Sequence, residues 1–170
     1  MNKSIFILGR QPAIGIAELE SLYGAAAVQP LVGAAIVDID PKDVDFNRLG
    51  GAMKLGLVLN ELNTVDWFKI EKYILKMVPE HLQYVPEGKL TLGLSVYNLS
   101  ATTTMLTKTG LTLKKIIKAT GRPVRLVPNK LPALGSAQVI HNDLCGERGW
   151  ELVFVHRREK TIVSLTVAEQ

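Results

Sequence analysis

The residues best suited to chemistry in this sequence are lysines, and they gather on one side of an expected helix around residues 106–118. At about 100° per residue, the apolar side chains of that helix fall on one arc and its lysines on the opposite arc. The apolar arc holds Leu106, Leu113, Ile116 and Ile117, and the basic arc holds Lys108, Lys114, Lys115 and Lys118. The basic arc could bind phosphates. It could equally be a solvated face that binds nothing, because exposed helix faces are usually charged.

Further basic and polar residues follow this lysine helix. A turn is expected at 121–123, a β-branched strand at 124–127, a loop at 128–132, and then a second extended run that ends at residue 142. The basic and polar residues in the turn, the strand, the loop and the end of the run are Arg122, Arg125, Asn129, Lys130, His141 and Asn142. A basic turn beside the lysine arc would extend a phosphate-binding surface.

Sequence patterns of catalytic and metal sites are missing. No G-x-G-x-x-G motif follows an expected strand, and there is no P-loop. The three histidines lie far apart in sequence, and none has a Cys or carboxylate at metal-ligand spacing. Cys145 could be a nucleophile in principle, although a small, partly buried thiol is the ordinary role of such a residue. We therefore expect no catalysis from this chain alone and no metal site.

Composition indicates a globular protein in a reducing compartment. The 170 residues are 47% hydrophobic and 21% charged, and the longest apolar runs fall far short of the ~20 residues of a transmembrane helix. The single cysteine excludes an internal disulfide, and we expect a cytoplasmic protein with no membrane partner. Residues 86–170 carry 12 Lys/Arg against 6 Asp/Glu, whereas residues 1–85 carry 8 against 10. This asymmetry suggests that the second half meets a polyanion.

The order of expected elements predicts an α+β fold in two parts. Residues 1–62 predict a strand at 3–8, a helix at 13–23, strands at 26–31 and 34–39, a short helix at 44–49 and a strand at 53–59. This β-α-β-β-α-β order is the ferredoxin-like arrangement. Residues 63–170 predict a polar joint, a helix at 67–78, a strand at 89–97, a polar loop at 100–104, the lysine helix and its following strands, and a hairpin at 151–156 and 161–167.

Two stretches together resemble one known family. They read SIFILGRQPAIGIAELESLYG near the N-terminus and GLTLKKIIKATGRPVRLVPNKLPALGSAQVIHN from residue 110. They resemble the N-terminal part of THUMP-containing tRNA guanosine methyltransferases. The resemblance implies a ferredoxin-like domain at 1–62 and a THUMP-like α/β RNA-binding domain at 63–170. The family's catalytic domain, with its Asp/Asn-Pro-Pro-Tyr/Phe motif and its glycine-rich S-adenosylmethionine loop, is absent from this sequence.

The resemblance also implies an RNA-binding surface. Carried over by position, that surface comprises Lys114, Lys115, Lys118, Arg122, Arg125, Asn129, Lys130, Ser136, Gln138, His141 and Asn142. Basic side chains neutralise phosphates, and the polar ones can bond to 2′-hydroxyls or to unstacked base edges. The polar residues could instead line the solvent face of a strand, cap a turn or satisfy backbone groups.

The leading functional hypothesis is therefore a tRNA-binding module. It would position the acceptor stem and 3′ end of tRNA for a methyltransferase domain in cis, which would use S-adenosylmethionine. One alternative is a protein-interaction or scaffold domain that does not bind RNA. Another is an enzyme with a dispersed site that uses Cys145 and His141.

Overall fold

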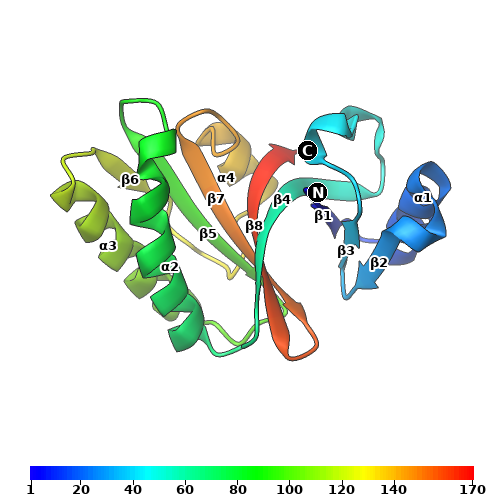
Figure 1. Ribbon diagram of the computed structural model, residues 1–170, viewed down its shortest axis with the longest axis horizontal. Coiled ribbons are helices and arrows are strands. Elements are labelled where there is room, and N and C mark those ends of the chain that lie inside the picture. Colours follow the sequence, from blue (N-terminus) through cyan, green and yellow to red (C-terminus); the bar gives the residue numbers. More distant parts are fainter.

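The computed structural model describes residues 1–170 and shows an α+β fold built on one mixed sheet (Figure 1). The eight strands lie in the order β2-β3-β1-β4-β8-β7-β5-β6. The strands are β1 Ser4–Leu8, β2 Val28–Leu31, β3 Ala34–Val37, β4 Ala52–Leu62, β5 Leu90–Tyr97, β6 Val124–Leu126, β7 Gly149–Arg157 and β8 Lys160–Glu169. The helices are α1 Pro12–Tyr23, α2 Trp67–His81, α3 Thr103–Ala119 and α4 Ser136–His141. The predicted fold class is confirmed, and no helix has the length and apolar character needed to cross a membrane.

The first four strands follow the ferredoxin-like order. Strand β1 lies between β3 and β4 and is antiparallel to both, and β2 forms the edge beside β3. The helix expected at 44–49 is wrong, because that segment contains only the 3₁₀ turn Phe46–Arg48. A second 3₁₀ turn, Pro41–Asp43, comes just before it. Proline begins this earlier turn and Asp40 caps it, so the segment is too short and interrupted for an α-helix.

Strand β4 pairs with strands of both predicted domains. Its residues 52–57 pair with β1, and its residues 54–62 pair with β8 near the other end of the chain. Figure 1 shows β4 and β8 side by side at the centre of the sheet, with α1 at one end of the molecule and α2 and α3 at the other. The predicted boundary at residue 62 stays a prediction, and one continuous sheet runs across it.

Helices α2 and α3 pack on one face of the second half of the sheet. The core there includes Leu92 and Leu94 of β5, together with Ile74 of α2 and Leu113 of α3. The alternation predicted at 89–97 sends every second residue into this core and the others to the opposite face. Gly93 is on that opposite face, where an added Cβ would stand only 2.6 Å from Leu134, which lies just before α4. Helix α4 and the segment leading to it therefore cover the far face of β5.

The extended run expected to end at residue 142 is wrong, because residues 136–141 form α4. The Gln138 side chain accepts a hydrogen bond from the Gly135 backbone N–H and so closes the first turn. Val139 is fully buried in a small cluster with Val127, Leu134 and Leu144. Tertiary packing and this cap override the strand preference of the adjacent Val139 and Ile140.

The lysine helix begins earlier than expected. Thr102 caps α3 by accepting a hydrogen bond from the Met105 backbone N–H at 3.2 Å, so the helix includes the last two residues of the loop expected at 100–104. Leu106, Leu113 and Ile117 of the predicted apolar arc are buried in the core.

Candidate nucleic-acid interface

The three predicted α3 lysines form an uncompensated basic face. Lys115 and Lys118 are exposed and Lys114 is half-buried. The ion pairs of the structure involve Lys3, Lys42, Lys54, Arg157 and Lys160, so none of the α3 lysines has a carboxylate partner. These ammonium groups are free to meet an external anion.

Arg125 lies on the other face of the sheet. It sits on edge strand β6 opposite Thr91 of the parallel strand β5. Its neighbours Val124 and Leu126 pack into the core under α2 and α3, so the exposed Arg125 side chain projects to the α4 face. The structure therefore divides the predicted basic residues around the sheet edge: the lysines lie on the α3 side and Arg125 on the α4 side.

Arg122 is largely committed to backbone carbonyl groups. Its Nη1 donates to the carbonyls of Pro86 and Gly88 at 2.7 and 3.2 Å. Its Nη2 donates to those of Leu82 and Val85 at 3.3 and 3.0 Å. The guanidinium thereby holds the segment after α2 against the end of α3. Little of its hydrogen-bonding capacity remains for a phosphate.

Most of the predicted polar residues also have internal partners. Asn129 Nδ2 donates to the Leu94 carbonyl at 2.8 Å, and Asn142 Nδ2 donates to the Gln138 carbonyl at 2.7 Å. Gln138 also donates to the Pro128 carbonyl at 3.4 Å.

Two further residues of the predicted surface remain open to an external partner. Lys130 and His141 are exposed and make no side-chain hydrogen bond or ion pair within the chain. The Asn142 Oδ1 atom is buried without a partner. The groups open to an external partner are thus Lys114, Lys115, Lys118, Arg125, Lys130 and His141.

Two basic residues near this surface were missed. Lys89 and Arg148 line a polar cleft of about 490 Å³ next to Asn142. Each comes just before a strand, Lys89 before β5 and Arg148 before β7. Charged residues are common in such turns, so the sequence does not indicate that these two line a cleft. The acids Glu87 and Asp143 line the same cleft and offset this charge.

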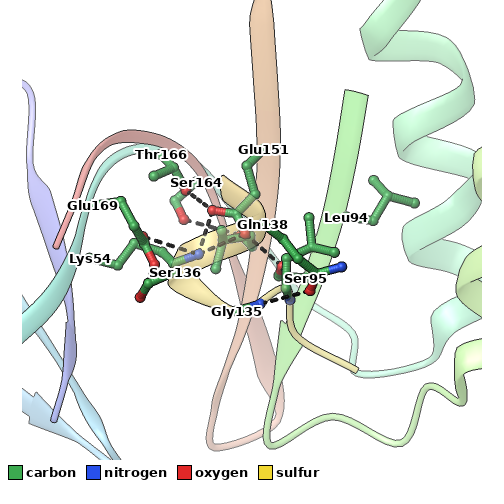
Figure 2. Close-up of polar contacts among 12 residues, drawn as sticks. Lys54, Leu94, Ser95, Gly135, Ser136, Gln138, Glu151, Ser164, Thr166 and Glu169 are labelled. Atoms are coloured by element: carbon green, nitrogen blue, oxygen red, sulfur yellow. Dashed lines mark hydrogen bonds and ion pairs between the residues drawn. The ribbon is translucent and has the colours of Figure 1, made fainter. Parts of the chain in front are cut away.

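A buried ionic cluster was also missed (Figure 2). Lys54 Nζ lies 2.5 Å from Oε1 and 2.6 Å from Oε2 of Glu151, and both side chains are almost fully buried. The same Nζ lies 3.5 Å from Glu169 Oε2, which has no hydrogen-bond partner. Ser95 and Thr166 donate to the Glu151 carboxylate at 2.7 and 2.5 Å. The only sign of this cluster in the sequence is a charged residue inside each of two apolar strands, Lys54 in β4 and Glu151 in β7.

Burial shifts the pKa values in this cluster. Burial raises the pKa of Glu169 above its ordinary value, although the Lys54 charge and the Ser136 hydrogen bond oppose the shift. Burial alone would lower the pKa of Lys54. The negative charges around it, of which that of Glu151 has the largest effect, outweigh burial, so the pKa of Lys54 is raised above its ordinary value. Lys54 therefore stays protonated, and the cluster holds one more carboxylate than cation.

The surroundings of Cys145, the candidate nucleophile of the sequence, disfavour that role. Burial around the Cys145 thiol, with help from the carboxylates of Glu169 and Glu151, raises its pKa to about 11, so the thiolate needed for nucleophilic attack is scarce at neutral pH. No three His, Cys, Asp or Glu side chains converge as metal ligands. None of the strand-to-helix connections is glycine-rich.

Comparisons with known proteins show a shared fold at low sequence identity. No protein-family model and no curated protein matches the sequence. TrmN from Thermus thermophilus matches at a TM-score of 0.55 and 14% identity, over 99% of this chain and 46% of that one. A possible methylase from Clostridium difficile 630 matches at 0.57 and 12%, over 98% and 41%. A 4-thiouridine synthetase in complex with RNA and ATP matches at 0.50 and 13%, over 97% and 41%. This chain thus spans less than half the length of each of these proteins.

Proposed function

We propose that this chain is a tRNA-binding module that presents the acceptor stem and 3′ end of tRNA to a methyltransferase domain in cis. The observation that carries the proposal is a set of unpaired cations on both sides of the sheet edge at β6: Lys114, Lys115 and Lys118 lie on the α3 side and Arg125 on the α4 side, and Lys130 is exposed in the loop after β6. Unpaired cations along an edge suit a phosphate backbone, because each contact releases counterions.

The fold supports the same proposal. Its whole length is similar to less than half of a synthetase solved with RNA and of a possible methylase. We infer that it corresponds to the ferredoxin-like and THUMP-like part of such enzymes, and that S-adenosylmethionine binds only to the catalytic part. This chain then supplies substrate binding and orientation, and the reacting atoms meet residues outside it.

The two sides of the surface have different roles in this proposal. The α3 lysines contact phosphates and carry no sequence information, whereas the exposed His141 ring on the α4 side can stack on or bond to an unpaired base. A tRNA therefore gains contacts that a blunt duplex cannot make.

A three-ligand binding experiment tests this proposal. Fluorescence anisotropy would compare intact tRNA, the same tRNA without its four 3′-terminal nucleotides, and a blunt RNA duplex of the acceptor-stem sequence. We expect intact tRNA to bind tightest, and the other two to bind with similar, lower affinity. Equal affinity for all three would leave only nonspecific phosphate binding and would contradict recognition of the 3′ end.

One observation favours a protein-interaction role instead. Helix α1 exposes Ile14 and Leu22 on its outer face, with side chains 63% and 56% accessible. An apolar helix face that nothing covers suits a protein partner better than RNA. This second candidate predicts no retention of tRNA even at low salt, so the same anisotropy experiment separates it from the first.

A further inference from the structure

Two polar links hold the start of α4, one on each side of its N-cap residue Gly135. Before the cap, the Leu134 backbone N–H donates to Ser95 Oγ at 2.9 Å. After the cap, Ser136 Oγ donates to Glu169 Oε1 at 2.7 Å. Figure 2 shows Ser95 and Ser136 near Gly135, in the same region as Lys54, Glu151 and Glu169.

Both links end on one ion pair. Ser95 Oγ donates to Glu151 Oε2 at 2.7 Å, and Lys54 Nζ binds both oxygens of Glu151. On the other branch, Glu169 Oε2 lies 3.5 Å from the same Nζ. The side chains of β4, β5, β7 and β8 thus form one circuit that begins and ends on the residues flanking Gly135. This positioning circuit comprises Lys54, Ser95, Glu151 and Glu169.

Helix α4 has little other anchorage. It is six residues long, and Val139 is its one fully buried side chain. The apolar cluster beneath it has four members, whereas the cluster under α2 and α3 has 18. A short helix with so small an apolar contact depends on its polar links for its exact place on the sheet.

The circuit cannot contact RNA itself. Ser95 and Glu151 are fully buried, and Lys54 has 2% of its surface accessible. Helix α4 carries Gln138 and His141 of the predicted RNA-binding surface and is followed directly by Asn142. A change in the circuit can reach RNA only by moving α4.

We propose that Lys54, Ser95, Glu151 and Glu169 are positioning residues that hold α4 in the orientation needed to bind the RNA end. The inference rests on the proposed function and extends it. It predicts that buried residues far from the basic face control affinity for tRNA without changing the number of phosphate contacts. Because Lys54 comes from the N-terminal part of the chain, that part contributes to the RNA surface without touching the ligand.

A matched pair of variants of the full chain tests the inference. Ser95→Ala removes the link to Leu134 and one hydrogen bond to Glu151. Ser164→Ala, the control, deletes an equally buried hydroxyl that donates to the Val153 carbonyl at 3.1 Å, outside the circuit. Hydrogen exchange would be followed at the backbone amides of Val139 and Leu144, which bond to Gly135 and Val139. Salt titrations of tRNA binding would accompany it.

In Ser95→Ala we expect exchange at these amides to be about tenfold faster than in Ser164→Ala, which is the effect of losing about one net hydrogen bond. Affinity for tRNA should fall about three- to tenfold, with an unchanged slope against salt, because no cation has been removed. Equal exchange in the two variants would overturn the positioning role. Faster exchange with unchanged affinity would overturn its link to RNA.

If Ser95→Ala fails to fold, Glu169→Ala cuts the other branch and carries the same expectations. If the parent chain binds no tRNA, the proposed function fails and the RNA part of this inference fails with it. The exchange data on the free protein still decide whether the circuit holds α4.

Discussion

Lys54 Nζ and the Glu151 carboxylate form a buried, two-oxygen ion pair although the residues are 97 positions apart in sequence. Lys54 belongs to β4, which pairs with β1, and Glu151 to β7, and β8 lies between those two strands. The pair therefore joins the ferredoxin-like part of the sheet to the part that carries the basic surface. Taking two charges out of water is costly, so such a pair depends on each partner being present.

Removing one partner of this pair should destabilise the protein strongly. Lys54→Met leaves the Glu151 carboxylate buried without its cation, and we expect a loss of about 3–5 kcal/mol in the free energy of unfolding. The double variant Lys54→Met/Glu151→Leu removes both charges and should recover much of that loss. Urea denaturation of the two variants and the parent gives the comparison. A double variant as unstable as the single one would show that the pair is not an isolated electrostatic unit.

Glu169→Gln should change how stability depends on pH. Because the folded-state pKa of Glu169 is raised, the parent gains stability from proton uptake at low pH and loses it as the pH rises through that pKa. The amide imitates the protonated acid and can still accept the bond from Ser136. The difference in melting temperature, variant minus parent, should therefore increase as the pH rises from 5 to 8. A constant difference across this range would contradict a raised pKa.

The strands could be predicted better than the contacts between them. Alternation of Leu90, Leu92 and Leu94 with smaller residues predicts β5 because every second side chain must enter the core. The buried pair could not be predicted, since periodicity locates a residue within its element but does not say which distant strand it meets. Helix α4 was missed because adjacent β-branched residues imitate a strand and its stability comes from tertiary contacts.

The candidate site was likewise predictable only in part. The lysine arc of α3 follows from helical spacing, and the structure has Lys115 and Lys118 exposed on that helix, whereas RNA binding by the arc stays a prediction. The commitment of Arg122 and Asn129 to backbone carbonyls depends on loops folding back from elsewhere in the chain. Sequence spacing contains no information about such contacts.

Arg122→Ala should affect stability more than electrostatics. It removes the Arg122 donors from four carbonyls of the segment after α2, of which only that of Leu82 keeps another donor, the Val85 backbone N–H, so we expect a loss of about 1–3 kcal/mol and faster proteolysis between residues 82 and 88. The salt slope of tRNA binding should stay nearly constant. Arg122→Lys keeps the charge but not the fork of donors and is the matched control. A slope reduced in Arg122→Ala and restored in Arg122→Lys would instead assign Arg122 to a phosphate.

Limited proteolysis tests the predicted division at residue 62. The joint at 63–66 and the segment at 83–89 are mostly exposed and outside helices and strands, apart from the short 3₁₀ turn at 82–84. We expect proteinase K, which cuts with little sequence preference, to cut in these two segments first. Mass spectrometry of early fragments identifies the sites. First cuts within β5 would contradict the division, since that strand is mostly buried and is paired on both sides, with β6 and β7.

The most direct test of RNA binding by the α3 face is the salt dependence of tRNA affinity for the parent and for Lys115→Ala/Lys118→Ala. If about four cations contact phosphates, the logarithm of the binding constant should fall against the logarithm of salt with a slope near −3. The double variant should lower the magnitude of this slope by roughly 1.5, and thermal melts should be nearly unchanged because alanine favours the helix. Arg10→Ala/Arg48→Ala removes the same charge from exposed positions in the N-terminal part and should leave the slope as it is. An unchanged slope in the lysine variant, or an equal loss in the control, would contradict the assignment of RNA binding to α3.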